Sequence, residues 1–197
     1  KKISIPSTSA DDNHVKTEIT LKAGDLPLAS MSVKKTYNGV AKLQGQHELL
    51  VVFHAIDADD TKNYPEVQIS DLSISNKDIK KYEAAKASYL SERDKKRLDN
   101  AKKSFQGEYD FSLKDFTSFK VLRTGRYSGS PEMSVTFDMS TEELIKKTGP
   151  NFLVDLGKLI EKQVKIEKDE TERAFGIYFD YPRTFTHHIV FEIPDGY

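Results

Sequence analysis

The strongest constraint on the fold is an alternation of apolar and polar residues near the end of the chain, from Phe185 to Ile193. The side chains expected on one side of an extended strand are Phe185, His187, Ile189, Phe191 and Ile193. A period of two is typical of a half-buried strand. Together with a similar strand predicted over 174–181, it indicates an antiparallel sheet that is covered on one face.

Further strands are predicted across the chain from the same pattern, at 14–22, 28–37, 67–74, 110–122, 132–139, 152–160 and 163–167. Gly125 to Pro131 predicts a turn between two of them, and Asn38-Gly39 is the strongest short turn signal. The run from Val40 to Ile56 fits either a buried strand or a helix, and we favour a helix that leads into a buried segment.

Two helices are predicted. Ser75 or Asn76 would cap a long one over about residues 78–105, which carries a thin apolar stripe at helical spacing. Its acidic and basic side chains interleave, which favours a solvated face over a surface for anionic lipid or glycan. A short helix is predicted near 141–148, because Ser140 to Glu143 resembles a helix N-terminus and Gly149-Pro150 would end it.

These elements predict an α+β fold, an antiparallel sheet or sandwich with one long charged helix. At 197 residues the chain is long enough for one sizeable core. We expect residues 1–197 to form a single β-rich module, and nothing marks a linker between domains.

Composition excludes several classes of function. The formal net charge of −1 argues against a nucleic-acid partner, which normally requires a basic excess. No apolar run is long enough for a transmembrane helix. The absence of cysteine rules out disulfides, thiolate metal sites and a cysteine nucleophile.

Histidines offer two weak metal-site patterns. His47-Glu48 begins like a zincin motif, but the next histidine, His54, is seven residues on and not four. His187 and His188 are adjacent on a predicted strand and would point to opposite faces. We predict no metal site and no cofactor.

No catalytic motif is present either. Tyr127 to Ser130 lacks the glycine-x-serine-x-glycine pattern of a nucleophile elbow. Any two of the 31 acidic residues could converge on a hydrolytic site, but no pattern singles out a pair. We predict that the chain is not an enzyme and assign no catalytic residue.

One family shares an ordered set of segments with the end of this chain. The segments are Gly149–Leu153, Leu156–Ile160 with Gln163, Glu172-Arg173, Tyr181-Pro182-Arg183 and the closing Phe191–Tyr197. They resemble the C-terminal, non-catalytic region of bacterial transglutaminase-like proteins. The resemblance covers about residues 140–197 and is looser over 28–50.

The resemblance implies an accessory module that is part of a longer polypeptide. The family's core uses a Cys-His-Asp triad, which a chain without cysteine cannot supply. Such proteins are exported to the Gram-negative envelope, so an extracytoplasmic location is implied.

We therefore expect a module that positions a catalytic core or binds a protein partner. The first alternative is a free-standing glycan- or protein-binding module that exposes Tyr127, Tyr178 and Tyr181. The second is a hydrolase built on scattered carboxylates.

Overall fold

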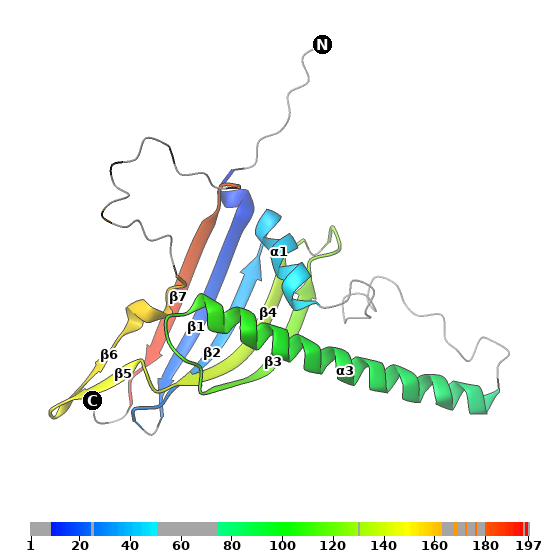
Figure 1. Cartoon of the computed structure of the whole chain (residues 1–197), viewed down its shortest axis with the longest axis horizontal. Coiled ribbons are helices and arrows are strands. Elements are labelled where there is room, and N and C mark those ends of the chain that lie inside the picture. The colour runs from blue at the N-terminus through cyan, green and yellow to red at the C-terminus, as the bar shows by residue number, and fades with distance from the viewer. Residues whose placement is uncertain are drawn as a thin grey trace, which may run out of the picture.

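The computed structural model describes residues 9–24, 26–50, 75–129, 131–162 and 180–194, together with the single positions Lys168, Glu172, Gly176 and Gly196. These residues exclude the strands predicted at 67–74 and 163–167, most of the one at 174–181, and the end of the 40–56 segment. Figure 1 shows a twisted sheet with helices in front of it and a small hairpin beside it.

The sheet has five strands in the order β3-β4-β2-β1-β7. They are β1 (His14–Ala23), β2 (Ala29–Tyr37), β3 (Asp115–Thr124), β4 (Met133–Thr141) and β7 (Thr184–Glu192). All neighbours pair antiparallel except β1 and β7, which run parallel with Val15 opposite Phe185. The α+β class and the mostly antiparallel sheet are confirmed. Most of the strand predicted at 174–181 lies outside the described residues, so its pairing with the last strand stays a prediction.

Two helices cover one face of the sheet (Figure 1). Helix α1 (Gly39–Leu49) follows β2, and helix α3 (Asn76–Glu108) is the predicted long charged helix. Phe105 of α3 stacks on Phe137 of β4, with ring centroids 4.2 Å apart. Inward side chains of the central strands, such as Ile19, Val33 and Val135, complete this core, whose burial is the main stabilising contribution.

The other face of the sheet is polar, as the alternation predicts. Lys16 and Lys34 form ion pairs with Glu18 at 2.9 and 3.3 Å, and Ser32 donates a hydrogen bond to Asp138 at 2.8 Å. In the part of the chain that the structure describes, the five-stranded sheet carries a helical layer on one face, and the other sheet has only two strands. The second layer there is helical, where a sandwich would have a second large sheet.

Helix α1 begins at the predicted Asn38-Gly39 turn. The side chain of Asn38 caps no backbone group. The Asn13 carboxamide oxygen accepts a hydrogen bond from the N–H of Val40 at 2.9 Å, and so replaces the missing cap. The Asn-Gly pair thus lies between a strand and a helix, and not between the two strands of a hairpin.

The short helix predicted near 141–148 is wrong. Residues 142–144 form a bend, and Ile145–Thr148 is strand β5, paired with β6 (Asn151–Val154). The Thr141 hydroxyl oxygen accepts from the N–H of Glu143 and closes a local turn that competes with a helix. Gly149-Pro150 is therefore the turn of the β5–β6 hairpin. The strand predicted over 152–160 also ends early, because Leu156–Leu159 forms the 3-10 helix η3 around Gly157.

Candidate functional site

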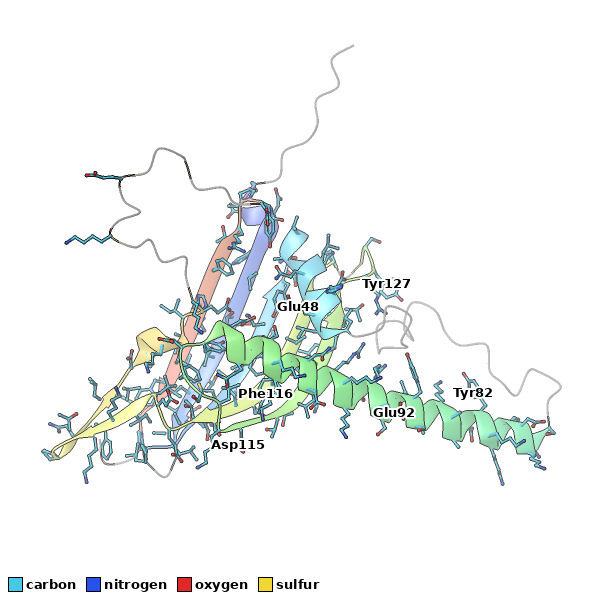
Figure 2. All side chains as sticks on the ribbon, in the orientation of Figure 1. Glu48, Tyr82, Glu92, Asp115, Phe116 and Tyr127 are labelled. Atoms are coloured by element: carbon cyan, nitrogen blue, oxygen red, sulfur yellow. The ribbon has the colours of Figure 1, made fainter. Side chains whose placement is uncertain are left out.

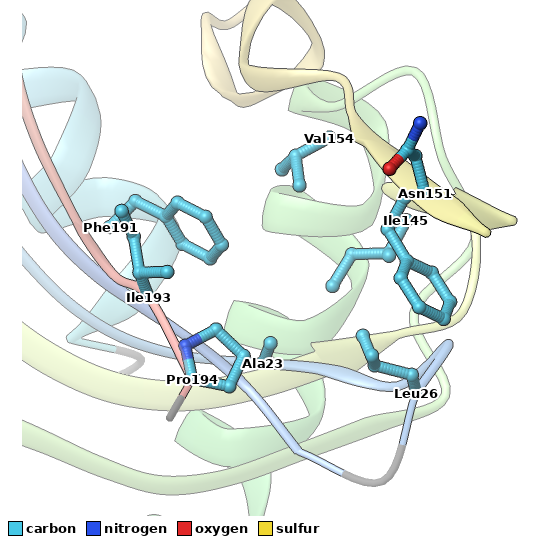
Figure 3. Close-up of a pocket in the computed structure, with 9 residues that line it drawn as sticks. Ala23, Leu26, Ile145, Asn151, Val154, Phe191, Ile193 and Pro194 are labelled. Carbon is cyan, nitrogen blue, oxygen red and sulfur yellow. The ribbon is translucent and has the colours of Figure 1, made fainter. Parts of the chain in front are cut away.

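An apolar pocket lies where the β5–β6 hairpin meets the ends of β1 and β7 (Figure 3). Its volume is about 320 Å³. Eight of its nine lining residues are apolar, and the polar one is Asn151: the lining comprises Ala23, Leu26, Ile145, Asn151, Phe152, Val154, Phe191, Ile193 and Pro194. Among the residues that the structure describes, no charged side chain lines it, so the pocket suits an apolar group of a partner.

The β5–β6 hairpin forms one wall of the pocket and is anchored to the hydrophobic core. Leu144 and Ile145 are buried, and the N–H of Asp155 donates to the Leu144 carbonyl at 2.9 Å. Phe152 and Val154 face the pocket, whereas Leu153 points to the opposite side of β6 with 62% of its surface exposed. The far side of the hairpin therefore exposes one large apolar side chain, Leu153, beside Lys146. Ile193 at the other wall is 65% exposed.

A second, charged cavity of about 170 Å³ lies between α1 and the inner face of β1, β2 and β7. At its base the Lys35 ammonium, 1% exposed, lies 2.5 Å from Glu108 Oε2 and 2.7 Å from Glu161 Oε1. Thr17 donates a further hydrogen bond to Glu161 at 3.1 Å. The Lys162 N–H donates to the Glu108 carbonyl at 2.9 Å, which brings the end of α3 and the segment after η3 together.

Burial controls the protonation of this charged cluster. It raises the pKa of Glu108, an effect that the nearby Lys35 ammonium opposes. Burial would by itself lower the pKa of Lys35, but the acidic groups around it, Tyr37 first and then Glu108 and Glu161, outweigh burial and hold that pKa well above its usual value. Burial also raises the pKa of Tyr37 and Tyr109 beside the cluster, so both phenols are neutral at physiological pH.

The histidines lie where the strand pattern predicts. His187 is on the covered face, with Nε2 at 3.7 Å from Glu161 Oε1, and His188 lines the polar face. His47 is exposed in the last turn of α1, and His54 lies outside the described residues. Within the described part of the chain, no group of three or more His, Asp or Glu side chains is placed to hold a metal ion. The predictions of no metal, no cofactor and no catalytic residue stay predictions.

The tyrosines proposed for a glycan surface do not form a row. Tyr127 belongs to the connection between β3 and β4, near α1 in Figure 2. Tyr181 precedes β7 and lines the charged cavity at the opposite edge of the sheet. Tyr178 lies outside the described residues.

The part of α3 that extends beyond the sheet carries other exposed aromatics (Figure 2). Tyr82 and Tyr89 are 46% and 45% exposed, and the buried residues of the helix, Arg97, Ala101 and Phe105, all belong to its second half. The predicted apolar stripe is therefore used for packing at one end of the helix.

Sequence reasoning missed both sites, although one signal was present. Lys35 shares a predicted strand face with Ala29, Met31 and Val33, and a lysine on an apolar face needs a buried partner. Nothing local to Glu108 or Glu161 indicates that they supply it.

Comparison of the chain with known protein families, with curated proteins and with solved structures found no match. No helix in the described ranges is long and apolar enough to cross a membrane.

Proposed function

We propose that this chain is a non-catalytic accessory module of a transglutaminase-like envelope protein, and that its apolar pocket docks on the catalytic core of the same polypeptide. The pocket is the observation that supports this proposal. A pocket whose described lining is apolar except for Asn151, beside a hairpin that exposes Leu153, is typical of a surface that another protein covers.

The location of the pocket agrees with the resemblance on which the family assignment rests. Seven of the nine lining residues, all except Ala23 and Leu26, fall within residues 140–197. Among the described residues, β7 has a hydrogen-bonded neighbour on one side, β1. A sheet edge of this kind can pair with an added strand. The extracytoplasmic location proposed for the protein is supported by the family resemblance alone.

The test begins with the intact mass of the native polypeptide in its source cell. The proposal expects a mass well above the 22.4 kDa of this chain, with peptides from a cysteine-containing domain. Hydrogen–deuterium exchange then compares the isolated chain with the native polypeptide. Stronger protection of residues 145–154 and 188–194 in the native polypeptide, without a change in β4, would support docking at the pocket.

Two results would overturn the proposal. One is a native mass close to 22.4 kDa. The other is equal exchange of the pocket segments in the isolated chain and in a longer native polypeptide, because a covered pocket must exchange more slowly.

A hydrolase is a second candidate because two carboxylates, Glu108 and Glu161, converge on the charged cavity, and burial raises the pKa of Glu108. A raised pKa suits a general acid. Lys35, however, forms ion pairs with both carboxylates. This arrangement fits a structural ion-pair network better than a hydrolytic site. A screen with chromogenic glycosides and esters tests this candidate: turnover that is lost in both Glu108→Gln and Glu161→Gln would favour it over docking.

A further inference from the structure

His187 carries a buried ring nitrogen that has no hydrogen-bond partner. The residue lies in the middle of β7, and its side chain is 11% exposed. Its Nε2 atom is buried and makes no hydrogen bond in the part of the chain that the structure describes. Buried polar atoms are nearly always hydrogen-bonded, so this one requires an explanation. Histidine is also the side chain that ordinarily changes its charge between about pH 5 and 8.

The carboxylate of Glu161 faces this nitrogen. Its Oε1 atom lies 3.7 Å from Nε2, which is too long for a hydrogen bond but close enough for an ion pair once the ring is charged. Both side chains are 11% exposed, so water and salt screen the two groups only weakly. The two residues come from different elements, since His187 belongs to β7 and Glu161 follows η3. A proton on Nε2 would therefore join these elements.

Other charged groups near the pair act in both directions. The Lys35 ammonium of β2 contacts the same oxygen of Glu161 at 2.7 Å, and its positive charge opposes a proton on His187. Arg183, which precedes β7, lines the same cavity as Glu161 and adds to this opposition. Glu108, at the end of α3, pairs with Lys35 and offsets part of its charge.

The remaining neighbours in the described ranges are negative or neutral. Glu48 of α1 lines the same cavity as Glu161. Thr17 of β1 is opposite His187 in the sheet, is uncharged, and donates to Glu161 Oε1 at 3.1 Å. Burial raises the pKa of Tyr37 and Tyr109, which stay neutral at physiological pH. Glu161 is thus the charged group with an ion-pair contact to Nε2, and it favours the protonated ring.

The two elements that this contact would join also carry the walls of the apolar pocket. Phe191 and Ile193 form one wall, a few residues after His187 along the chain. Phe152 and Val154 of β6 belong to the other wall, and η3 connects them to Glu161. A bond between His187 and Glu161 would therefore restrain the separation of the two walls.

We propose that His187 and Glu161 form a pH-sensitive latch between β7 and the segment after η3. When the ring is neutral, the latch is open, with the two atoms 3.7 Å apart. Protonation gives the ring a positive charge and an N–H at Nε2, which donates to the carboxylate at about 2.8 Å. The pocket walls should then be held more firmly at pH 6 than at pH 8. The latch acts on the pocket itself and does not depend on which molecule covers it.

Hydrogen–deuterium exchange of the full chain, followed by NMR at pH 6 and pH 8, tests the latch. His187→Gln is the main variant, because glutamine can donate to Glu161 but does not titrate. His188→Gln is the matched control, since this adjacent histidine lines the polar face of the sheet. The titration of Glu108, whose pKa burial raises, is common to the three proteins and cancels in the comparison.

The exchange comparison has a defined expected result. Protection of residues 152–161 and 187–193, taken relative to His187→Gln at the same pH, should rise about three- to tenfold from pH 8 to pH 6. This is less than a fully buried hydrogen bond to a charged group contributes, because Lys35 opposes the change. His188→Gln should behave like the wild type.

The imidazole nitrogen resonances provide a second measurement that a merely structural role of His187 would not change. At pH 6 the wild type should show an Nε2 proton on His187 that exchanges slowly with water. In Glu161→Gln, with folding checked by circular dichroism, that proton should exchange rapidly. If this variant does not fold, the comparison with His187→Gln decides alone.

Three results would overturn the proposal. The first is a ratio of protection between the wild type and His187→Gln that is the same, or lower, at pH 6. The second is a pH effect that His188→Gln removes as fully as His187→Gln does. The third is an Nε2 proton that is equally protected in the wild type and in folded Glu161→Gln.

Discussion

Lys35 Nζ lies 2.7 Å from Glu161 Oε1, and this buried ion pair joins the middle of the main sheet to the segment that follows η3. Glu108 completes the cluster from the end of α3. Three regions distant in sequence thus meet at one ammonium group. Removing one member of a buried ion pair usually costs more than replacing all of its members by neutral groups.

Lys35→Met should therefore destabilise the protein by about 3–5 kcal/mol, because it removes the buried ammonium that Glu108 and Glu161 both contact. The triple variant Lys35→Met, Glu108→Gln, Glu161→Gln should recover most of that loss. Urea denaturation followed by circular dichroism measures both. A single variant as stable as the wild type would show that the cluster is open to water.

The stability of the protein should depend on the ionisation of Glu108. Its folded-state pKa is raised by burial, so its contribution to stability is fully present below the unfolded value of about 4.5 and is lost as the pH rises through the folded value. The wild type should thus lose stability relative to Glu108→Gln between about pH 4 and the folded pKa.

Urea denaturation of the two proteins across this range provides the measurement. Glu18 and Glu143 have lowered pKa values and the opposite pH dependence, but they are present in both proteins and cancel in the difference. A difference in unfolding free energy that is constant with pH would contradict the raised pKa.

Two glycine substitutions should have opposite effects. Gly39 has φ +57°, and a Cβ there would clash with the Asp12 carbonyl oxygen and the Asn13 side chain. Gly39→Ala should destabilise the protein by more than about 1 kcal/mol. Gly107 lies near the end of α3 with open space around it, so Gly107→Ala should stabilise by up to about 1 kcal/mol. Thermal melts compare the two, and effects of the same sign would contradict this account of α1.

The long helix should be sensitive to mutation at one end. Phe105→Ala removes a buried ring that stacks on Phe116 and Phe137 and should cost about 3–5 kcal/mol. Tyr82→Ala, on the extended half of the same helix, should change stability by less than about 0.5 kcal/mol. Chemical denaturation distinguishes them, and similar losses would show that the extended half is also packed.

Local patterns predicted much of the fold. The strands at 14–22, 28–37 and 132–139 and the helix at 78–105 agree with the structure to within a few residues, because each carries a clear period over its whole length. The pattern at 140–150 predicts a helix, and this prediction is wrong. Leu144 and Ile145 fill the core next to a turn, and Ile145 begins a strand whose partner, Val154, comes later in the chain.

The sites depend on contacts that no local pattern encodes. The parallel pairing of β1 with β7 places Phe191 opposite Leu21, so that Phe191 and Ala23, from distant parts of the chain, line the same apolar pocket. Likewise, the partners of Lys35 come from a helix end and an irregular segment. Such long-range pairings depend on the assembled sheet, so periodicity predicts the faces of the strands but not which distant residues meet there.

The central claim is that the apolar pocket is covered by the catalytic core of the same polypeptide. Its most direct test is a photo-crosslinking amino acid at Ile193 in the native polypeptide, with a matched position at Ser32 on the polar face. The account predicts crosslinks from position 193 to peptides of a cysteine-containing transglutaminase-like domain, and few from position 32. Equal crosslinking from both positions, or none from position 193 to that domain, would contradict it.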